Sequence, residues 1–396
     1  MPESVEAPVI LSNEPGSFAW RVLAERHPAL IKKVRDAFPY GPEQHRALDA
    51  LLAQATDGVI ERLGPGAHDR DLWEGWGSGH FGRSWFDVPF LWAESYFYRQ
   101  LLEAVGYFEV GPWQGIDPFR PFKQAELQTV EAAEELAALD RPADPAAPDA
   151  EDQALLLGAL WGNRADLGFR IGSEGDAADA VDSGLVADES ALLWSLLPEG
   201  GRGALCLVAD NAGRELLPDL ILIDHLMSRQ RIERAVLHVK PYPYYVSDAT
   251  TADVIDGLRH LTTAPGAASE VGRRLWAAMG SGRLTVRAHT FSCAPLPYAD
   301  MPDDLRQEFA DATLTLVKGD LNYRRLVGDR LWPASTPFAE PTVYFPGPVA
   351  ALRTLKSDVI VGLDARTEAA LTAEHGQAWR TSGTHGLIQV RSRKDA

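Results

Sequence analysis

The chain has 396 residues, enough for two domains or for one large domain with a cap. Its formal net charge is −18, and because no stripe of Lys and Arg offsets it, we do not expect nucleic-acid binding. No apolar run is long enough to span a membrane, and residues 1–6 lack the features of a signal peptide, so we expect a cytoplasmic protein without a membrane partner. Cys206 and Cys293 lie in or beside apolar runs, which predicts two buried thiols.

The N-terminal third of the chain has helical character. Apolar residues recur at helical spacing in residues 46–62, 90–105 and 122–139. Residues 138–153 are rich in Pro, Ala and Asp and have no apolar period, which is typical of an exposed linker or loop. The sequence therefore predicts an N-terminal helical subdomain over residues 1–137, a linker or loop over 138–153, and an α/β catalytic domain over 154–396.

Short apolar or β-branched runs follow this segment, and helical stretches separate several of them. This is the pattern of a wound α/β domain. Strands are predicted at residues 205–209, 235–239, 284–287, 313–317, 342–345 and 358–361. The predicted fold is α/β, a Rossmann-like three-layer α/β/α sandwich with the helical subdomain at its N-terminus.

Two of these strands are followed by acidic side chains. Asp210 and Asn211 come directly after the apolar run 204–209, and Asp248 follows the strand at 234–239 after a short loop. A helical stretch begins after each. Because ligands of open α/β sheets bind outside the carboxyl ends of the strands, the two strand ends can converge on one cation. The alternative is that each aspartate only caps the helix that follows it.

The chemistry of these three side chains suits a hard divalent cation. Carboxylate and amide oxygens favour Mg²⁺ or Mn²⁺, and Co²⁺ or Ni²⁺ are also possible. Three protein ligands leave coordination positions for water or for a substrate phosphate, as a catalytic metal requires. A metal-binding role for Asp210, Asn211 and Asp248 is therefore the competing interpretation to helix capping.

A denser polar cluster lies downstream. The predicted strand that ends near residue 317 leads into a Gly turn and then into four polar residues, Asp320, Asn322, Tyr323 and Arg324. A planar guanidinium and neutral donors of this kind can hold a phosphate. Lys356 stands just ahead of another predicted strand, a place where a lone lysine usually faces solvent.

Five segments, in this order and at this spacing, resemble the damage-control phosphatases, in the subgroup that carries an RTxK motif and is described as acidic-residue methyltransferase-like. The segments are residues 160–167, 210–216, 246–250, 318–324 and 353–356. The resemblance runs from about Phe18 to Gln389 and includes residues 89–99. Gly168 departs from the family, which tends to have Ser after the NRADL segment.

The resemblance implies a metal-dependent phosphatase that hydrolyses small phosphorylated metabolites, with sugar phosphates such as fructose 1-phosphate as typical substrates. It assigns Asp210, Asn211 and Asp248 as catalytic metal ligands for Mn²⁺, Co²⁺, Ni²⁺ or Mg²⁺, and a metal-bound water or one of the aspartates as nucleophile. The implied substrate contacts are Glu215, Asp320, Leu321, Asn322, Tyr323, Arg324 and Lys356. Asn163, Arg164 and Asp166 either support the pocket or tie down a helix start.

Two other functions remain open from the sequence. Proteins of this subgroup are also described as S-adenosylmethionine-dependent carboxyl (glutamate) O-methyltransferases, with Glu215 and Asp248 at the cofactor. Residues 77–82 fit the string GxGxxG, but no strand precedes them and no helix follows, so a glycine-rich aromatic loop is the better interpretation. A metabolite-binding protein without turnover would require the loss of a metal ligand, and all three are present. The ten histidines form no zinc-type pair, and we expect His238 to be a core residue.

Overall fold

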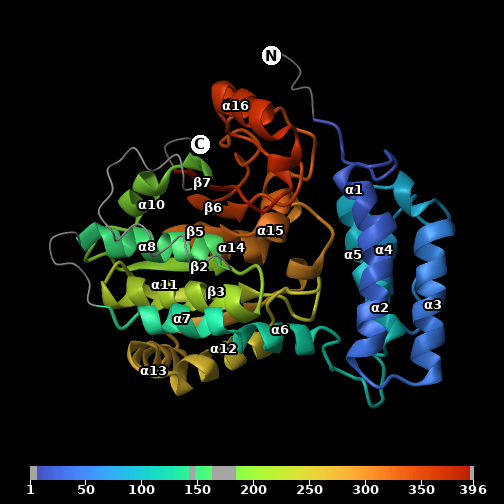
Figure 1. Cartoon of the computed structure of the whole chain (residues 1–396), viewed down its shortest axis with the longest axis horizontal. Coiled ribbons are helices and arrows are strands. Elements are labelled where there is room, and N and C mark those ends of the chain that lie inside the picture. The colour runs from blue at the N-terminus through green and yellow to red at the C-terminus, as the bar shows by residue number, and fades with distance from the viewer. Residues whose placement is uncertain (1–6, 142–147, 163–183, 393–396) are drawn as a thin grey trace.

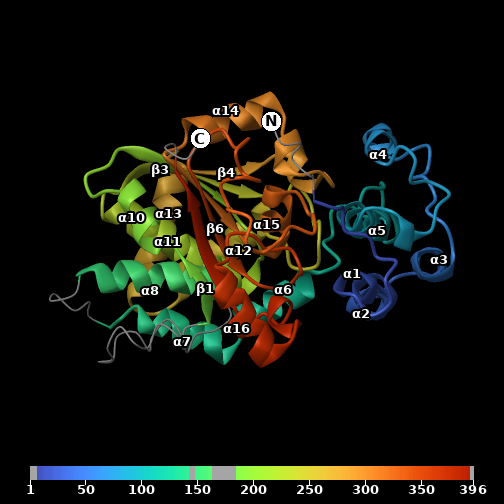
Figure 2. The ribbon, with the colours of Figure 1, turned by 90° about the horizontal axis from the view of Figure 1, so that it is seen from above.

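A computed structural model describes residues 7–141, 148–162 and 184–392. Helices α1–α5 form a group of their own beside a layered α/β body, and α6 and α7 run from that group along the body (Figure 1). The same separation is seen from above (Figure 2). Asn163, Arg164 and Asp166 lie outside the described residues. In the described part of the chain, no helix is both long and apolar enough to cross a membrane.

The N-terminal helices pack around α5, whose side chains are buried on almost every face. This core contains many aromatic rings, and Trp92 stacks on Tyr96 with 4.8 Å between ring centroids. The helices are α1 (Phe18–Arg21), η1 (Val22–Arg26), α2 (His27–Ala37), α3 (Pro42–Asp57), α4 (Arg70–Trp76), η2 (Trp85–Asp87), α5 (Phe90–Ala104), α6 (Arg120–Leu127) and α7 (Val130–Ala138).

The body is built on a seven-stranded sheet with the order β1-β7-β6-β5-β2-β3-β4. Neighbouring strands are parallel, except that β7 pairs antiparallel with β6. The strands are β1 (Leu185–Asp188), β2 (Gly203–Val208), β3 (Ile232–Val239), β4 (Leu284–Ala288), β5 (Leu314–Lys318), β6 (Val349–Thr354) and β7 (Gly386–Arg391).

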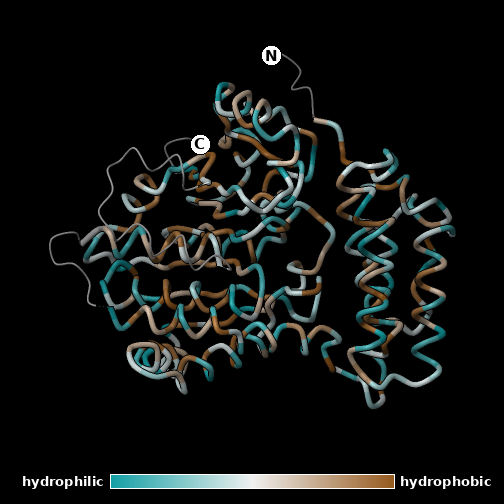
Figure 3. The backbone as a smooth tube through the Cα atoms, in the orientation of Figure 1, coloured by the Kyte–Doolittle hydropathy of each residue, from teal (hydrophilic) through white to brown (hydrophobic). Residues whose placement is uncertain are grey.

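Both faces of the sheet are covered, so alternate residues of the central strands enter two different cores. Leu205 and Leu207 of β2 face one core, whereas Cys206 and Val208 face the other. Helices α2 and α3 of the N-terminal group carry alternating hydrophilic and hydrophobic bands along their length (Figure 3), as expected for helices with one buried face. The first core includes α8 (Pro148–Trp161), α10 (Ser190–Leu196), α11 (Leu216–Ser228), α12 (Thr251–Thr263) and α13 (Ala267–Gly280). The second includes α14 (Asp303–Asp311), α15 (Asp320–Val327) and η7 (Ala378–Arg380), next to α16 (Ala365–His375).

The chain reverses its direction of travel across the sheet between β2 and β5. Strands β2, β3 and β4 are added in one direction, and β5 then pairs with the other side of β2. Loops that leave the carboxyl ends of two such strands diverge and open a crevice between them, which is where open α/β sheets bind ligands. The segments after β2, β3, β5 and β6 all leave this edge.

The α/β sandwich predicted from the sequence is confirmed, and so are the two buried free thiols. The predicted helix over residues 122–139 is two helices, α6 and α7, because Thr129 caps the start of α7 with its side chain. The strands predicted at 342–345 and 358–361 are wrong, since both stretches are turns and loops on either side of β6. Helix α8 includes the last six residues, 148–153, of the predicted linker. The division into two domains stays a prediction.

Candidate active site

The segments after β2 and β3 meet through a short antiparallel contact. An isolated bridge pairs Asn211 with Asp248. The amide of Ala249 donates to the carbonyl of Asp210 at 2.9 Å, and the amide of Ala212 donates to that of Ser247 at 2.6 Å. These backbone bonds fix the two segments against each other, so the structure brings Asp210, Asn211 and Asp248 into one cluster.

Neither aspartate caps a helix. Thr250 is the N-cap of α12 and forms a capping box with Asp253. The 3₁₀ turn η4 (Gly213–Glu215), which leads into α11, begins after Ala212. The capping alternative therefore does not explain Asp210 or Asp248. The Asp248 carboxylate instead accepts from the amide of Tyr245 at 3.2 Å.

Asn211 orients the acidic groups around it. Its Nδ2 donates to Asp210 Oδ2 at 3.1 Å and to Glu215 Oε2 at 2.7 Å. Its Oδ1 accepts from Ser247 Oγ at 2.7 Å, which leaves a second lone pair on that oxygen. Burial, followed by the charge of Glu215, raises the pKa of Asp210 to about 8. Burial also raises the pKa of Asp248, whose residue surface is 3% exposed.

This cluster fits a divalent cation. Burial and the nearby carboxylates of Glu215 and Asp248 raise the pKa of Asp210, and a bound positive charge would stabilise its ionised form. Among the described residues, no three His, Cys, Asp or Glu side chains are placed to hold a metal. The candidate ligand set therefore depends on the amide oxygen of Asn211 as the third donor beside Asp210 and Asp248. Hard oxygen donors of this kind suit Mg²⁺ and Mn²⁺.

Gly319, which joins β5 to α15, makes room for Asp210. It has φ +82° and ψ 175°, a conformation that is open almost only to glycine. A Cβ atom at this position would lie 1.9 Å from Asp210 Cγ. The start of α15 therefore lies against the candidate metal ligand. A small cavity beside this contact is lined by Leu160, Asp210, Asn211, Glu215, Asp219, Lys318, Gly319, Leu352 and Thr354.

The turn after β6 is folded around Asp320, the first residue of α15. Arg353 donates to Asp320 Oδ1 through Nε at 2.8 Å and forms an ion pair with it through Nη2 at 2.7 Å. The same carboxylate oxygen accepts from Ser357 Oγ at 3.1 Å and from the amide of Lys356 at 3.2 Å. Burial acts to raise the pKa of Asp320, but the charges of Arg353 and Arg324 and the hydrogen bonds from Ser357 and Arg353 together outweigh burial and hold the pKa below its ordinary value.

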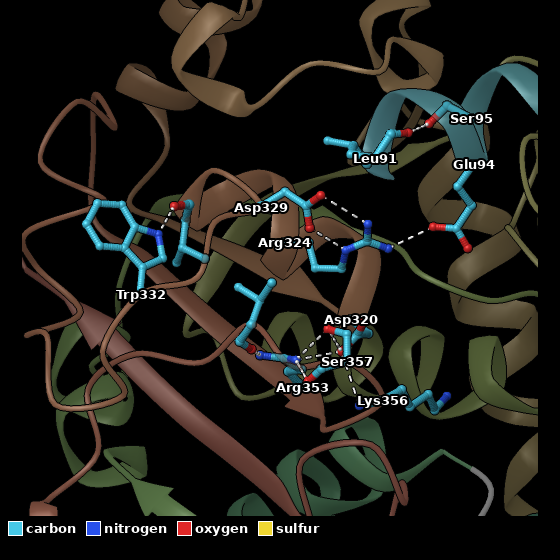
Figure 4. Close-up of polar contacts among 12 residues, drawn as sticks. Leu91, Glu94, Ser95, Asp320, Arg324, Asp329, Trp332, Arg353, Lys356 and Ser357 are labelled. Carbon is cyan, nitrogen blue, oxygen red and sulfur yellow. Dashed lines mark hydrogen bonds and ion pairs between the residues drawn. The ribbon is translucent and has the colours of Figure 1, made fainter. Parts of the chain in front are cut away.

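Lys356 is the exposed residue of this turn. Figure 4 shows its side chain extending away from the Asp320, Arg353 and Ser357 cluster. Its Nζ lies 3.8 Å from Glu215 Oε1, and 46% of its side chain is exposed. The charge of Glu215, ahead of the charge of Asp210, raises the pKa of Lys356. Lys356 is therefore a cation at the rim of the Asp210 cluster.

Three other residues of the expected substrate segment are held inside the protein. Asn322 donates to the carbonyls of Ala209 and Lys318 at 3.0 and 2.9 Å, so it ties the ends of β2 and β5 together. The hydroxyl of Tyr323 donates to Gln389 Oε1 at 2.9 Å. Leu321 packs in a small apolar cluster with Leu91, Tyr244 and Cys293. The side chains of Leu321, Asn322 and Tyr323 therefore have a structural role next to the site.

Arg324 is placed differently from the sequence expectation of a guanidinium free to bind phosphate. It donates to Asp329 through Nε at 2.6 Å and to Glu94 through Nη1 at 2.9 Å, and it lies between these two carboxylates in Figure 4. Its residue surface is 3% exposed. Glu94 belongs to α5, so this ion pair connects the N-terminal helices to α15. Glu94 and Arg324 are 230 residues apart, so the local sequence around either residue does not predict this ion pair.

Sequence reasoning also missed a buried ion pair in the cavity wall. Lys318 Nζ lies 2.8 Å from Asp219 Oδ1, and it also donates to the carbonyl of Ala159. Burial raises the pKa of Asp219 to about 6 despite the Lys318 charge. Asp219 stands four residues after Glu215, a spacing that puts both on one face of a helix, so this residue could have been found from the sequence.

The family model and the sequence relatives carry the same family description. The family model described as "Damage-control phosphatase ARMT1-like domain" matches residues 22–371. "Damage-control phosphatase ARMT1" of Rattus norvegicus is 30% identical, with 97% of this chain and 98% of that protein covered. The protein of the same name from Homo sapiens is 30% identical, with 94% and 96% covered. A solved DUF89 family protein from Pyrococcus horikoshii has a TM-score of 0.46 at 14% identity and covers 85% of this chain and 93% of its own.

Proposed function

This chain belongs to the ARMT1-like damage-control phosphatase domain family, and we propose that it is a metal-dependent phosphomonoester hydrolase of small phosphorylated metabolites. Sugar phosphates such as fructose 1-phosphate are the proposed substrates, and Mn²⁺, Co²⁺, Ni²⁺ or Mg²⁺ is the proposed cofactor. Asp210, Asn211 and Asp248 are its proposed ligands. Carboxylate and amide oxygens are the donor types that these ions accept.

The observation that carries the proposal is the meeting of three features at one edge of the sheet. The acidic cluster at Asp210 lies against the start of α15, and Lys356 stands beside it. Backbone N–H groups in the first turn of a helix have no partner within the helix and bind anions. A cation site, a helix N-terminus and a lysine together supply what a phosphate dianion requires.

Each residue has a proposed task in hydrolysis. A divalent cation bound by the cluster would polarise a phosphoryl oxygen and offset negative charge in the transition state. Lys356 and the first N–H groups of α15 hold the other phosphoryl oxygens. Arg353 keeps the Asp320 carboxylate engaged, which limits its repulsion of the phosphate. Arg324, held by two carboxylates, is proposed to fix α15 in place. The proposed nucleophile is water or one of the aspartates. Few catalytic side chains are needed, because phosphoryl transfer depends mainly on positioning and electrostatics.

A screen of sugar phosphates with each divalent metal, run beside a methylation assay with S-adenosylmethionine, tests the function directly. We expect phosphate release that depends on added metal and stops in EDTA. Full phosphate release by EDTA-treated, metal-free protein would contradict metal dependence. Methyl transfer without phosphate release would reverse the order of the two candidate activities.

Lys356→Ala should weaken the binding of a phosphorylated substrate without weakening metal binding. A charge-assisted hydrogen bond contributes about 1.5–3 kcal/mol, so we expect KM to rise by roughly tenfold to a hundredfold. Removing a positive charge beside Asp210 should leave the affinity for Mn²⁺ unchanged or increase it. Steady-state kinetics and Mn²⁺ titration calorimetry measure the two effects. Lys33→Ala, which changes an exposed lysine of α2, is the control. A collapse of Mn²⁺ binding in Lys356→Ala would argue against its assignment to the phosphate.

The methyltransferase alternative predicts a different ligand preference. The sulfonium of S-adenosylmethionine is positive, and two like unit charges about 4 Å apart repel by about 1 kcal/mol even in water. In the presence of Mn²⁺ we therefore expect inorganic phosphate or a sugar phosphate to raise the melting temperature through mass action, and S-adenosylmethionine to raise it little. A melting shift with S-adenosylmethionine and none with phosphate esters would favour the methyltransferase.

A further inference from the structure

Helix α6 touches both segments that carry the proposed metal ligands. It approaches the segment after β2 at Gly213, where a Cβ atom would lie 2.6 Å from Glu126 Oε2 and 3.0 Å from the carbonyl of Lys123. It approaches the segment after β3 through the Lys123 side chain, whose Nζ donates to the carbonyl of Asp248 at 2.8 Å. A single helix from outside the sheet therefore braces both segments of the cluster.

Lys123 is held in a fixed place. Its residue surface is 3% exposed, and besides the Asp248 carbonyl its Nζ donates to Asp117 Oδ2 at 2.8 Å and to Asp253 Oδ2 at 3.0 Å. An ammonium group has three donors, and three acceptors use them. Burial acts to lower the pKa of Lys123, but the charges of Asp117 and Asp253 and the hydrogen bonds to them together outweigh burial and raise this pKa.

The contacts of Lys123 also reach the start of α12. Asp253 Oδ2 accepts from the amide of Thr250 at 2.9 Å, which is part of the capping box that begins the helix, and also from the Thr250 hydroxyl at 2.7 Å. Lys123 therefore connects the capping box to the backbone of Asp248, which lies two residues before Thr250. This connection limits the freedom of the Asp248 backbone, and hence of its carboxylate.

We propose that Lys123 is a positioning residue that sets Asp248 in the geometry needed to bind the divalent cation. The inference rests on the proposed function for the identity of the site, but it concerns metal affinity and not turnover. Groups that orient metal ligands typically change metal affinity tenfold to a hundredfold when they are removed. A positioning role and a purely electrostatic role also predict opposite signs, since loss of a nearby positive charge alone should tighten cation binding.

The test compares Mn²⁺ binding by the full-length wild type and by Lys123→Met, Lys123→Arg and Asp117→Asn. We expect about tenfold weaker binding in Lys123→Met, and weaker binding also in Lys123→Arg, because a guanidinium keeps the charge but not the geometry of three donors. Asp117→Asn changes the same cluster away from Asp248 and should lower stability with less than a twofold change in Mn²⁺ affinity. Calorimetry and the Mn²⁺-induced rise in melting temperature are the readouts, and neither requires turnover.

Each result supports or overturns the inference. Unchanged Mn²⁺ affinity in both Lys123 variants, with lowered stability, would show a merely structural role, and tighter binding in Lys123→Met would show a role through charge. If Lys123→Met does not fold, Lys123→Arg decides alone. Wild type that binds Mn²⁺ but hydrolyses no phosphate ester would remove the proposed function and leave the inference standing. Wild type that binds no divalent cation would overturn both.

Discussion

Asp210→Asn is expected to reduce phosphatase turnover by about a thousandfold while the protein stays folded. A catalytic metal contributes several kcal/mol to transition-state stabilisation, and about 4 kcal/mol corresponds to a factor of a thousand. Asparagine preserves the shape of the side chain but removes the charge that a divalent cation requires. Turnover with a sugar phosphate at saturating Mn²⁺, together with Mn²⁺ titration calorimetry, measures the loss.

The melting temperature of the metal-free Asp210→Asn variant separates the loss of a metal ligand from a failure to fold. The raised pKa of Asp210 means that its ionised form is disfavoured in the folded state, so the wild type loses stability as pH rises from the ordinary aspartate pKa toward about 8. Asp210→Asn removes this loss, and we expect a melting temperature in EDTA at pH 8 that equals or exceeds that of wild type. A large drop would show that Asp210 is needed for folding, and full activity would show that it is no ligand.

Asp188→Asn is the matched control. Asp188 is also an aspartate at the carboxyl end of a strand, but it ends β1, which runs parallel to β7 and therefore opposite to the central strands. Its carboxylate accepts from the amide of Ser190 at 2.9 Å, a bond that an asparagine oxygen can also accept. Turnover and Mn²⁺ affinity should stay at wild-type levels in this variant.

The positions of Asp210, Asn211 and Asp248 could be predicted because they depend on local pattern. Buried apolar runs identified β2 and β3, and parallel neighbours place their carboxyl ends at one edge. Strands β1 and β7, at one side of the sheet, could not be predicted in this way. β7 pairs antiparallel with β6 and parallel with β1, which lies about 200 residues earlier, so its partners are remote in sequence. The apolar stretches at 342–345 and 358–361 matched strand propensity, but tertiary contacts override such propensity.

The contacts around the site also depend on residues that are remote in sequence. In the RTxK motif, residues 353–356, Arg353 is buried against Asp320 and Ser357, whereas Lys356 is exposed. The pairing of Arg324 with Glu94 and the bond from Lys123 to Asp248 join segments 125 or more residues apart. No spacing rule connects such positions, which are brought together by the contact of α5 with α15 and of α6 with the segments after β2 and β3.

Gly319→Ala should abolish metal binding at the Asp210 cluster. The added methyl group would lie 1.9 Å from both Cγ and Oδ2 of Asp210, far inside contact distance, so either the carboxylate or the start of α15 must move. The backbone is also strained, because φ +82° with ψ 175° disfavours any residue with a Cβ atom. We expect loss of the Mn²⁺-induced rise in melting temperature and a fall in turnover of at least a hundredfold, since displacing a catalytic group by about 1 Å can have that effect.

Gly376→Ala separates the collision from the backbone strain. Gly376 follows α16 with φ 62° and ψ −135°, and no atom lies within 4 Å of the position that its Cβ would take. Both alanine variants should lose stability in urea, by roughly 1–3 kcal/mol for the strained backbone. Only Gly319→Ala should also lose Mn²⁺ binding, because only there does the methyl group meet a proposed ligand. Wild-type Mn²⁺ affinity in a folded Gly319→Ala protein would mean that Asp210 is free to move aside without cost, and therefore that it does not bind the metal in this geometry.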